Sequence, residues 1–540
     1  MKKTILLLIL TIFSFNFLIA QQTISETEKL ASLGKIYGFL KYYHPEIAQG
    51  RFDLDNQLIK QIPLVLKASD KDELSKVYLD WIDSFGVLEN CKTCELEKGS
   101  FNKNFNLFWL KDSLKFNNQL IKKLIFIEKN RFQGENYYAK TEYVGKIKIT
   151  NEPKYENFEY PNQNYRLLGL FKYWNIVEYF FPYKYLCDEN WDLVLLEMIP
   201  KFKIASSKTI YQNNIKEMVS KLDDSHAWIY FNTNEKKYLP VKVSHIENKP
   251  VIAGFYNKSI AKENNLKLGD IILKINDLDL IEEAKKELKY ISASNLKFKI
   301  KESYQKVLEG EKDDIKLTIL RNNQIKEVYT KKYYFKEFNY WNSNSEKYKS
   351  LTDNIGYLNM AKVESQDISE IFKAFKNKKA IIIDLRNYPK FIYRYFTKYL
   401  NDEARDFAKV YSPNINYPSK FLLKDNLKTL KSKKAYKGKV IILVNGETFS
   451  RAEFTAMAFQ TANNAITIGN QTVGADGDVI VFEYLGGFKT AFSGNGILYP
   501  NGEETQRKGI KIDIKVYPTI KGLKQGRDEL LEKAIEVVKD

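Results

Sequence analysis

The residues best suited to chemistry lie in one stretch of ten, Asn445–Phe454 (NGETFSRAEF). The apolar run Val440–Val444 before it is typical of a buried strand, the Asn-Gly pair ends that strand, and the residues after Ser450 have helical spacing. We therefore expect Ser450 at the start of a helix, where unpaired backbone N–H groups and the dipole favour negative charge on a hydroxyl. A nucleophile is favoured at such a place. Ser is also a preferred N-cap residue, so this stretch alone leaves a purely structural role open.

A serine nucleophile needs a general base, and histidine is the usual one because its pKa lies near neutrality. The chain has three histidines, His44, His226 and His245. His226 follows Ser225 in the segment Lys221–Phe231 (KLDDSHAWIYF). An isolated histidine is more often a surface or core residue than a catalytic one, and we interpret His44 and His245 in that way.

Length and composition indicate a large globular protein. A chain of 540 residues exceeds what one hydrophobic core organises, so several domains are expected. An apolar content of 44%, with 14% aromatic residues, argues against a disordered chain. The formal net charge is +18, but the lysines are scattered and form no clustered basic stripe. The sequence therefore favours no nucleic-acid partner, and it indicates no cofactor and defines no oligomeric state.

The first twenty residues have the pattern of a signal peptide. Met1–Ala20 begins with two lysines, continues with an apolar run and ends with a small residue. No other stretch is apolar and long enough to span a bilayer, so we expect export to the periplasm or the medium without stable membrane insertion. In an exported protein, Cys91 and Cys94 are expected to form a local disulfide. A zinc site is not expected, because no second Cys/His pair accompanies them.

The elements that must position these residues begin with a helical region that contains an internal repeat. Ser25–Phe85 and Tyr165–Leu222 both have helical spacing, and they align at a constant separation of 137 residues. The alignment matches two pairs of prolines, Pro45 with Pro182 and Pro63 with Pro200. We interpret this as a duplicated helical unit, with residues 21–160 and 161–238 as the two copies. Between the two aligned stretches, Asn102–Ile149 is expected to contain strands.

A β-rich module follows in residues 239–336. Its central run, Val251–Leu280, predicts a strand, a short helix around Ser259–Asn265, a Leu-Gly-Asp turn and the strand Ile271–Ile275. On these residues the module resembles a PDZ domain. Such domains bind an extended peptide by adding it to a sheet edge. The resemblance implies that Ile252, Gly254 and Phe255 bind the peptide.

Residues 337–540 are expected to form an α/β core. Short apolar strands are predicted at Ile355–Leu358, Ala380–Leu385, Val440–Val444 and Ala465–Ile468, with helical segments between them. Functional residues in such folds gather on the loops that follow the strands. Ser450 is expected on one of these loops.

The order of these features resembles the tail-specific (C-terminal-processing) serine peptidases, and more closely their branch that is similar to the tricorn protease core. The resemblance covers roughly His226 to the C-terminus. It implies a multidomain α+β fold whose catalytic core is of the ClpP/crotonase type. The processing branch uses a Ser–Lys dyad, but the block that would carry the lysine has Ala475, which cannot accept a proton.

In the tricorn-like branch the base is a histidine in a Ser-His pair before the PDZ domain, which Ser225 and His226 match. The resemblance therefore implies Ser450 as nucleophile, His226 as general base and Ser225 as a hydroxyl that orients the imidazole. A carboxylate usually completes such a relay. Glu504 is the expected carrier, whereas the family's spacing places Gln506 there, so the two remain alternatives, beside a surface role for Glu504.

The oxyanion hole is expected to use the backbone N–H of Arg451 and a second N–H from the loop after Leu385. The family often has a Gly pair in this loop, but here it reads Asn387–Phe391 (NYPKF). Pro389 has no N–H, so the second donor would be Lys390 or Phe391.

We therefore predict an exported serine endopeptidase that acts on extended or C-terminal segments of proteins. The alternative is a catalytically impaired peptide- or ligand-binding protein on the same fold.

Overall fold

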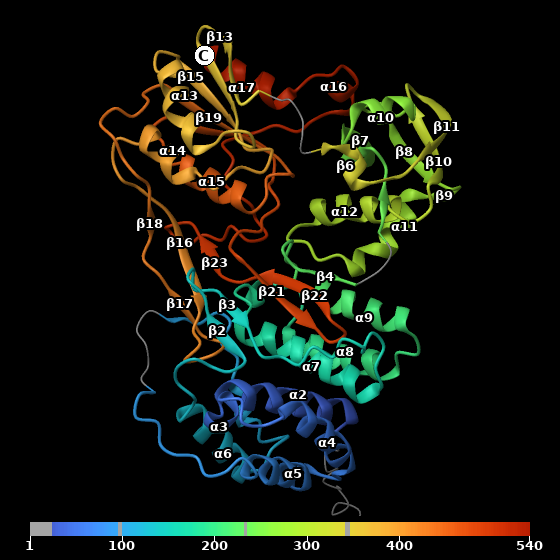
Figure 1. Ribbon diagram of the computed structural model, residues 1–540, viewed down its shortest axis with the longest axis vertical. Helices are drawn as coiled ribbons and strands as arrows, with labels where there is room; N and C mark the ends of the chain where they lie inside the picture. Colours follow the sequence, from blue (N-terminus) through green and yellow to red (C-terminus); the bar gives the residue numbers. More distant parts are fainter. Residues whose placement is uncertain (1–23, 95–99, 232–234, 341–345, 540) are drawn as a thin grey trace, which may run out of the picture.

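The computed structural model describes residues 24–94, 100–231, 235–340 and 346–539. The molecule is elongated, with a helical region at one end and two α/β parts side by side at the other (Figure 1). The predicted signal peptide lies outside the described residues. No described helix is long and apolar enough to cross a membrane. The predicted disulfide between Cys91 and Cys94 is confirmed.

The helical region consists of two sets of three helices with matching bounds. The first set is α2 (Glu26–Tyr43), α4 (Leu54–Lys67) and α5 (Lys71–Asp83), and the second is α7 (Gln163–Phe180), α8 (Trp191–Ile204) and α9 (Lys208–Ser220). Each helix of the second set begins and ends 137 residues after its counterpart. The repeat seen in the sequence thus corresponds to three pairs of helices, and the two helices of each pair have the same length.

The two sets contact each other reciprocally. Lys35 forms an ion pair of 2.8 Å with Asp192, and Lys172 forms one of the same length with Asp55. Lys35 and Lys172 occupy equivalent positions in the two sets, as do Asp55 and Asp192. Such an exchange of partners is typical of an interface with two-fold symmetry. The helices α2 and α7 cross closely, because a Cβ atom at Gly34 would come within 2.6 Å of the Phe171 ring.

The segment between the two sets differs in part from the prediction. In the described part of this segment, strands occur only as the hairpin β2 (Ala139–Thr141) and β3 (Ile147–Ile149), together with the short β1 (Ser100–Phe101). Most of the remainder is helical or irregular, with η1 (Phe108–Lys111) and α6 (Asn118–Lys129). The reason is the spacing of Leu120, Leu124 and Ile127, which places three buried side chains on one face of α6.

The β-rich module contains a sheet in the order β11-β10-β8-β7-β6, with helices beside it. Its predicted strand Ile271–Ile275 is β8, and its predicted short helix is α10 (Lys258–Glu263). The other elements are β6 (Val241–Ile246), β7 (Lys249–Phe255), β9 (Leu278–Asp279), α11 (Leu280–Glu287), η3 (Leu288–Tyr290), α12 (Leu296–Leu308), β10 (Asp314–Arg321) and β11 (Gln324–Lys331). The helix α12 packs against β6, the outer strand.

The C-terminal core is a sheet in the order β13-β14-β15-β19-β20-β24, parallel except for β13 (Tyr348–Thr352) at one edge. Four predicted strands are confirmed as β14 (Ile355–Asn359), β15 (Ala380–Asp384), β19 (Lys439–Val444) and β20 (Ala465–Gly469). The last strand is β24 (Ile514–Lys515). One face of the sheet packs on α13 (Ile368–Phe375), α14 (Tyr393–Leu400) and α15 (Arg451–Phe459), and the other on α17 (Glu529–Lys539). The predicted α+β class is thereby confirmed.

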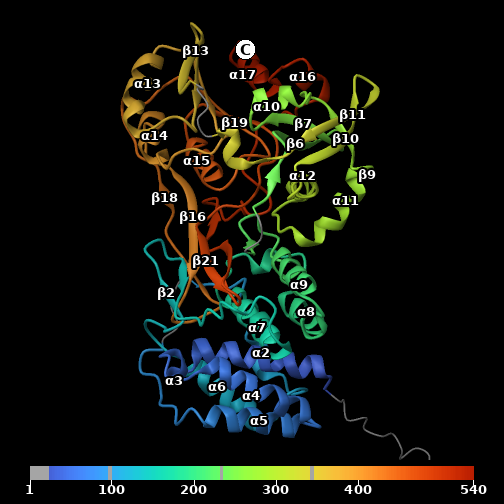
Figure 2. The same ribbon diagram turned by 45° about the vertical axis from the view of Figure 1, so that its right-hand side comes forward.

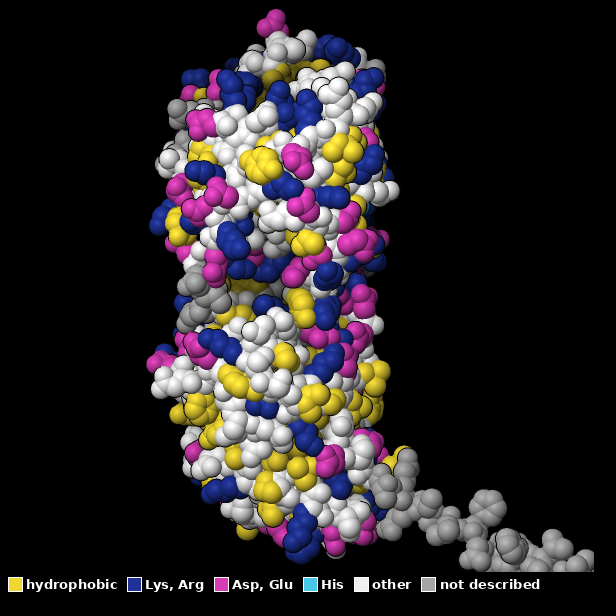
Figure 3. Space-filling model, turned by 90° about the vertical axis from the view of Figure 1, so that its right-hand side faces the viewer, with side chains coloured by type: hydrophobic (Ala, Val, Ile, Leu, Met, Phe, Trp, Pro, Cys, Tyr) yellow, Lys and Arg dark blue, Asp and Glu magenta, His cyan; other side chains and the backbone are white. Residues whose placement is uncertain are grey.

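Smaller sheets connect the core to the helical region (Figure 2). In one, β16 (Asp406–Pro413) pairs with β17 (Phe421–Leu423), β18 (Leu427–Lys428) and β23 (Gly496–Leu498). In another, β22 (Phe488–Ser493) lies between β21 (Val479–Tyr484) and β4 (Trp228–Tyr230). The second sheet matters most for function, because it joins the chain just after His226 to a hairpin of the core. Lys, Arg, Asp and Glu side chains are interspersed on the face shown in Figure 3.

Candidate active site

Ser450 lies at a sharp turn between β19 and α15. Its backbone has φ +53° and ψ −117°, which is rare for a residue other than glycine. The Thr448 hydroxyl donates to the carbonyl of Leu385 at 3.0 Å, and the Ser450 N–H donates to the carbonyl of Ala475 at 3.1 Å. These bonds tie the turn to the end of β15 and to the loop between β20 and β21. An unfavourable conformation that is fixed in this way is common at functional sites.

Glu453, in the first turn of α15, is buried beneath the loop that contains Ser450 and binds its backbone. Its fully buried carboxylate accepts four hydrogen bonds, from the N–H groups of Ser450 (3.1 Å), Gly474 (2.8 Å) and Ala475 (3.1 Å) and from the hydroxyl of Thr472 (2.5 Å). Burial raises the pKa of Glu453 to about 7, although the four donors act in the opposite direction. Sequence analysis missed this residue, whose signal was the Ser-x-x-Glu pattern of a capping box.

His226 comes from a distant part of the chain and lies against Phe449, the residue before Ser450. It lies two residues before β4, and the pairing of β4 with β22 brings the end of β22 beside it. The imidazole packs against Phe449, with 4.7 Å between the ring centroids, and its Nδ1 lies 3.0 Å from the Ser493 hydroxyl oxygen. Burial lowers the pKa of His226, and the charge of Asp224 opposes this effect. The neutral imidazole that results can accept a proton.

Asp224 is the carboxylate closest to this imidazole, and sequence analysis missed it. Its side chain is fully buried, and Oδ1 lies 4.0 Å from Nδ1 of His226. It accepts hydrogen bonds from the N–H of His226 (3.1 Å), from the N–H of Ser493 (2.8 Å) and from Nε2 of Gln506 (3.1 Å). Asp224 therefore holds the backbone of both His226 and Ser493, whose side chains contact each other. The available signal was an acidic residue two positions before the histidine.

Ser225 and Glu504 occupy other positions than the resemblance implied. The Ser225 hydroxyl accepts a hydrogen bond from the N–H of Ser294 at 2.8 Å and not from the imidazole. Glu504 accepts hydrogen bonds from the Tyr185 hydroxyl (2.6 Å) and from Lys103 (3.0 Å). Among the described residues, no hydrogen bond or ion pair joins it to His226, Asp224 or Ser493. In the structure, Ser493 and not Ser225 contacts the imidazole, and the buried carboxylate nearest to it is that of Asp224 and not of Glu504.

Gln506, the alternative to Glu504, is buried and contacts Asp224. Besides its bond to Asp224, its Nε2 lies 3.4 Å from the Ser294 hydroxyl. A neutral amide at this position supplies no charge, but it donates to the carboxylate that does. The negative charge in this buried cluster therefore comes from Asp224, and Gln506 contributes a hydrogen-bond donor to it.

The loop after β15, where the second oxyanion donor was expected, lies beside Arg451. The Arg451 guanidinium is 5.2 Å from the ring centroid of Tyr388 and 5.5 Å from that of Phe391. The backbone N–H of Arg451, at the first position of α15, needs no acceptor within the helix and can point to a ligand. Lys390, the expected second donor, lies in the same loop and its side chain is exposed.

The expected peptide-binding residues lie on β7, an inner strand of the β-rich module. Ile252 is fully buried, its N–H donates to the carbonyl of Asp270, and its carbonyl accepts from Gly269, both at 2.9 Å. Gly254 and Phe255 pair with β6. Ile252 therefore has no N–H left for an added strand, which corrects that expectation. The outer strand on this side is β6.

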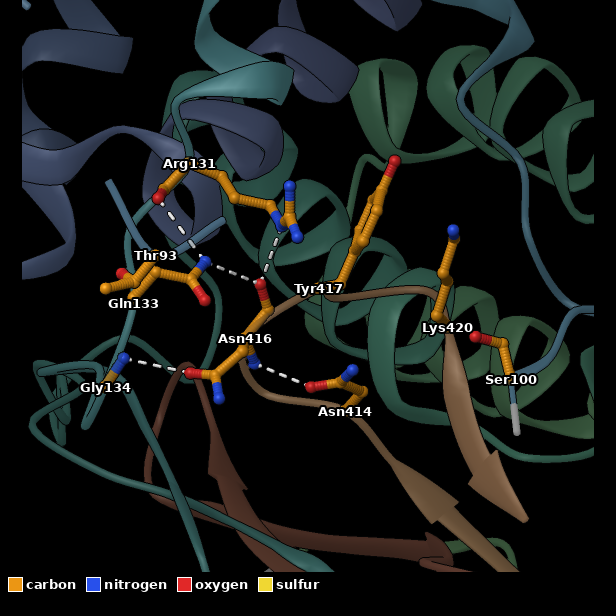
Figure 4. Close-up of a pocket in the computed structure, with 9 residues that line it drawn as sticks. All are labelled: Thr93, Ser100, Arg131, Gln133, Gly134, Asn414, Asn416, Tyr417 and Lys420. Carbon is orange, nitrogen blue, oxygen red and sulfur yellow. Dashed lines mark hydrogen bonds between the residues drawn. The ribbon is translucent and has the colours of Figure 1, made fainter. Parts of the chain in front are cut away.

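A polar cavity of about 360 Å³ lies elsewhere, where the helical region meets the loop between β16 and β17 (Figure 4). The Tyr417 ring lies between two cations, with Arg131 3.8 Å and Lys420 4.0 Å from its centroid. None of the candidate catalytic residues lines this cavity, so it is a separate feature.

Comparisons with known proteins support the assignment of the C-terminal core. Residues 354–516 match the model of peptidase family S41. The match includes Ser450 and Glu453, while His226 and Asp224 precede it. The chain thus resembles the tail-specific serine peptidases, as its sequence predicted, and the comparison supports a serine peptidase. No curated protein matches the chain in sequence.

Among solved structures, the chain is similar to mature CPAF complexed with lactacystin, with a TM-score of 0.56, 14% identity, and coverage of 70% of this chain and 98% of that one. A putative peptidase from Parabacteroides merdae has a TM-score of 0.46, 16% identity, and coverage of 70% and 97%. The photosystem II D1 C-terminal processing protease has a TM-score of 0.42, 14% identity, and coverage of 69% and 97%. The likeness to CPAF shows a shared fold.

Proposed function

We propose that this protein is an exported serine endopeptidase that cleaves peptide bonds in extended or C-terminal segments of proteins. The observation that carries the proposal is the position of His226, whose ring packs on the residue before Ser450 while Ser493 holds its Nδ1. A histidine fixed through one nitrogen beside a strained serine is the arrangement that activates a hydroxyl nucleophile.

In the proposed mechanism, the Ser450 hydroxyl oxygen attacks the carbonyl carbon of the scissile bond and its proton passes to Nε2 of His226. Ser493 keeps Nδ1 oriented, and the buried charge of Asp224 stabilises the imidazolium that forms. The N–H of Arg451 and a second N–H from the loop at Lys390 or Phe391 would bind the oxyanion.

Collapse of the tetrahedral intermediate breaks the peptide bond. His226 gives its proton to the amine that leaves, and an acyl ester remains on Ser450. A water molecule, deprotonated by His226, then attacks the ester, releases the acid and restores the serine. The sum is the addition of one water across one peptide bond.

We further propose that residues 239–336 act as a PDZ-like peptide-binding domain and that residues 21–160 and 161–238 arose by duplication. The first proposal is supported by the order of strands and helices and by the outer position of β6. The second is supported by the equal helix bounds and the reciprocal ion pairs of the two sets. Export is supported by the pattern of Met1–Ala20 and by the disulfide.

The test is cleavage of an unfolded protein substrate by the purified mature chain and by three variants. We expect Ser450→Ala and His226→Ala to abolish cleavage without loss of folding. Lys489→Ala, on the exposed side of β22, the strand that carries Ser493, should retain it. Cleavage that persists in His226→Ala would contradict the assignment of the base. A folded wild type that binds peptides without cleaving them would favour the alternative, a binding protein.

A further inference from the structure

The side chain of Arg451, the residue after the nucleophile, is held between two exposed aromatic rings. Tyr388 is 48% exposed and Phe391 is 64% exposed, although both lie next to the centre of the site. The guanidinium lies over both rings, at 5.2 and 5.5 Å from their centroids, within the range of cation–π contacts. Aromatic contacts hold the plane of a guanidinium and leave the N–H groups at its edge available.

Arg451 has no acidic partner among the described residues, unlike Arg386 and Lys301 nearby. Arg386, in the same loop as the two rings, forms ion pairs with Asp384 (2.6 Å) and Asp528 (2.7 Å). Lys301 pairs with Glu447, in the turn before Ser450, at 2.6 Å. Arg386 and Lys301 are thus paired with carboxylates, whereas the guanidinium donors of Arg451 are not.

The surroundings of Arg451 add further positive charge. Lys390 in the loop and Arg394 at the start of α14 are exposed, and neither has a carboxylate within 4.0 Å in the described part of the chain. Cations that line one side of a site attract anionic ligands. A guanidinium in such a position binds carboxylates through two parallel N–H donors.

We propose that Arg451 forms a carboxylate-binding subsite beside the nucleophile, so that the preferred substrate has a peptide carboxylate close to the scissile bond. The carboxylate would come from an aspartate or glutamate side chain or from the free C-terminus of the substrate. Tyr388 and Phe391 form the apolar walls of this subsite. The inference rests on the proposed peptidase function and adds the substrate class to it.

The test begins with a digest of a mixed peptide library, in which cleavage sites are mapped by mass spectrometry. The best sequence is then made in two forms that differ only by glutamate or glutamine at the enriched position. A further pair has a free or an amidated C-terminus and distinguishes the two sources of carboxylate. A charged hydrogen-bonded contact corresponds to a preference of about 10- to 100-fold in kcat/KM.

The result expected for the wild type is this preference for one carboxylate form over its neutral partner. In Arg451→Gln the ratio should fall to near one, whatever the absolute rate, and Arg451→Lys should give an intermediate ratio. Added salt should lower the ratio in the wild type, which tests the idea even if the variants do not fold. A strictly structural role for Arg451 would change rates without changing the ratio.

Cleavage by the wild type with no preference for a carboxylate would overturn this inference and leave the proposed peptidase intact. A ratio that persists in Arg451→Gln would assign the preference to other residues and also overturn it. A folded wild type that cleaves no peptide would overturn both proposals.

Discussion

Replacement of Asp224 by asparagine tests how much the buried negative charge near His226 contributes to catalysis. The variant Asp224→Asn keeps the size and shape of the side chain and removes one negative charge 4.0 Å from Nδ1 of His226. When His226 accepts the proton of Ser450, the imidazolium loses this charge as a partner. The change therefore acts on the transition state and should lower kcat more than it raises KM.

The magnitude follows from Coulomb's law. At a separation of 4.0 Å, two unit charges interact by about 4 kcal/mol with an effective dielectric constant of about 20. Since each 1.36 kcal/mol corresponds to a factor of about ten, the expected loss in kcat is roughly 1,000-fold. The asparagine NH₂ must also face the N–H of Ser493 or the two donors on Oδ1, which disturbs the serine that holds His226.

The assay is steady-state cleavage of a peptide across the acid range, with Glu504→Gln as the matched control. Glu504 bonds to Tyr185 and Lys103, so its amide variant should lose about three-fold in activity or less, as expected of contacts outside the relay. Because the charge of Asp224 raises the pKa of His226, the acid limb of Asp224→Asn should also move to lower pH. Near-normal kcat in Asp224→Asn, or an equal loss in Glu504→Gln, would refute the reasoning.

Three further outcomes are expected. Because burial lowers the pKa of His226, kcat/KM of the wild type should fall with an acid midpoint below the ordinary value of 6.5, and a midpoint above it would contradict a buried neutral base. Glu453→Gln should lower the free energy of unfolding by about 2 kcal/mol or more in denaturant titrations, because its NH₂ faces two donors in either orientation. Lys172→Met should lower the free energy of unfolding by about 3–5 kcal/mol, because it leaves the buried carboxylate of Asp55 without its ion-pair partner. The equivalent Lys35→Met, whose partner is partly exposed, should cost about 1 kcal/mol or less, and equal losses would contradict this difference.

Local patterns predicted the core well, because each of its strands is a short apolar run that ends at a turn residue. The strand before Ser450 and the helix after it follow from such patterns. The constant separation of 137 residues between two proline pairs anticipated the matching helices. The strands expected in Asn102–Ile149 occur as the β2–β3 hairpin at its end, while α6, with its buried helical face, lies earlier in the same stretch.

The relay could be predicted only in part, because it depends on pairing between segments far apart in the chain. Ser493 meets His226 only because β4 pairs with β22, and no local pattern states that register. The sequence shows Asp224 only as an acidic residue two positions before His226, whereas the family resemblance implies a carboxylate in the segment around Glu504. The expectation for Ile252 failed for a similar reason, since which strand is outermost is a property of the whole sheet.

The central claim, an activated Ser450 with His226 as its base, is tested most directly by labelling the purified mature protein with a fluorophosphonate probe and mapping the labelled peptide. We predict a single label on Ser450 in the wild type, unchanged in Lys489→Ala and lost in both Ser450→Ala and His226→Ala. A label on another serine, or full labelling of Ser450 in His226→Ala, would contradict the account.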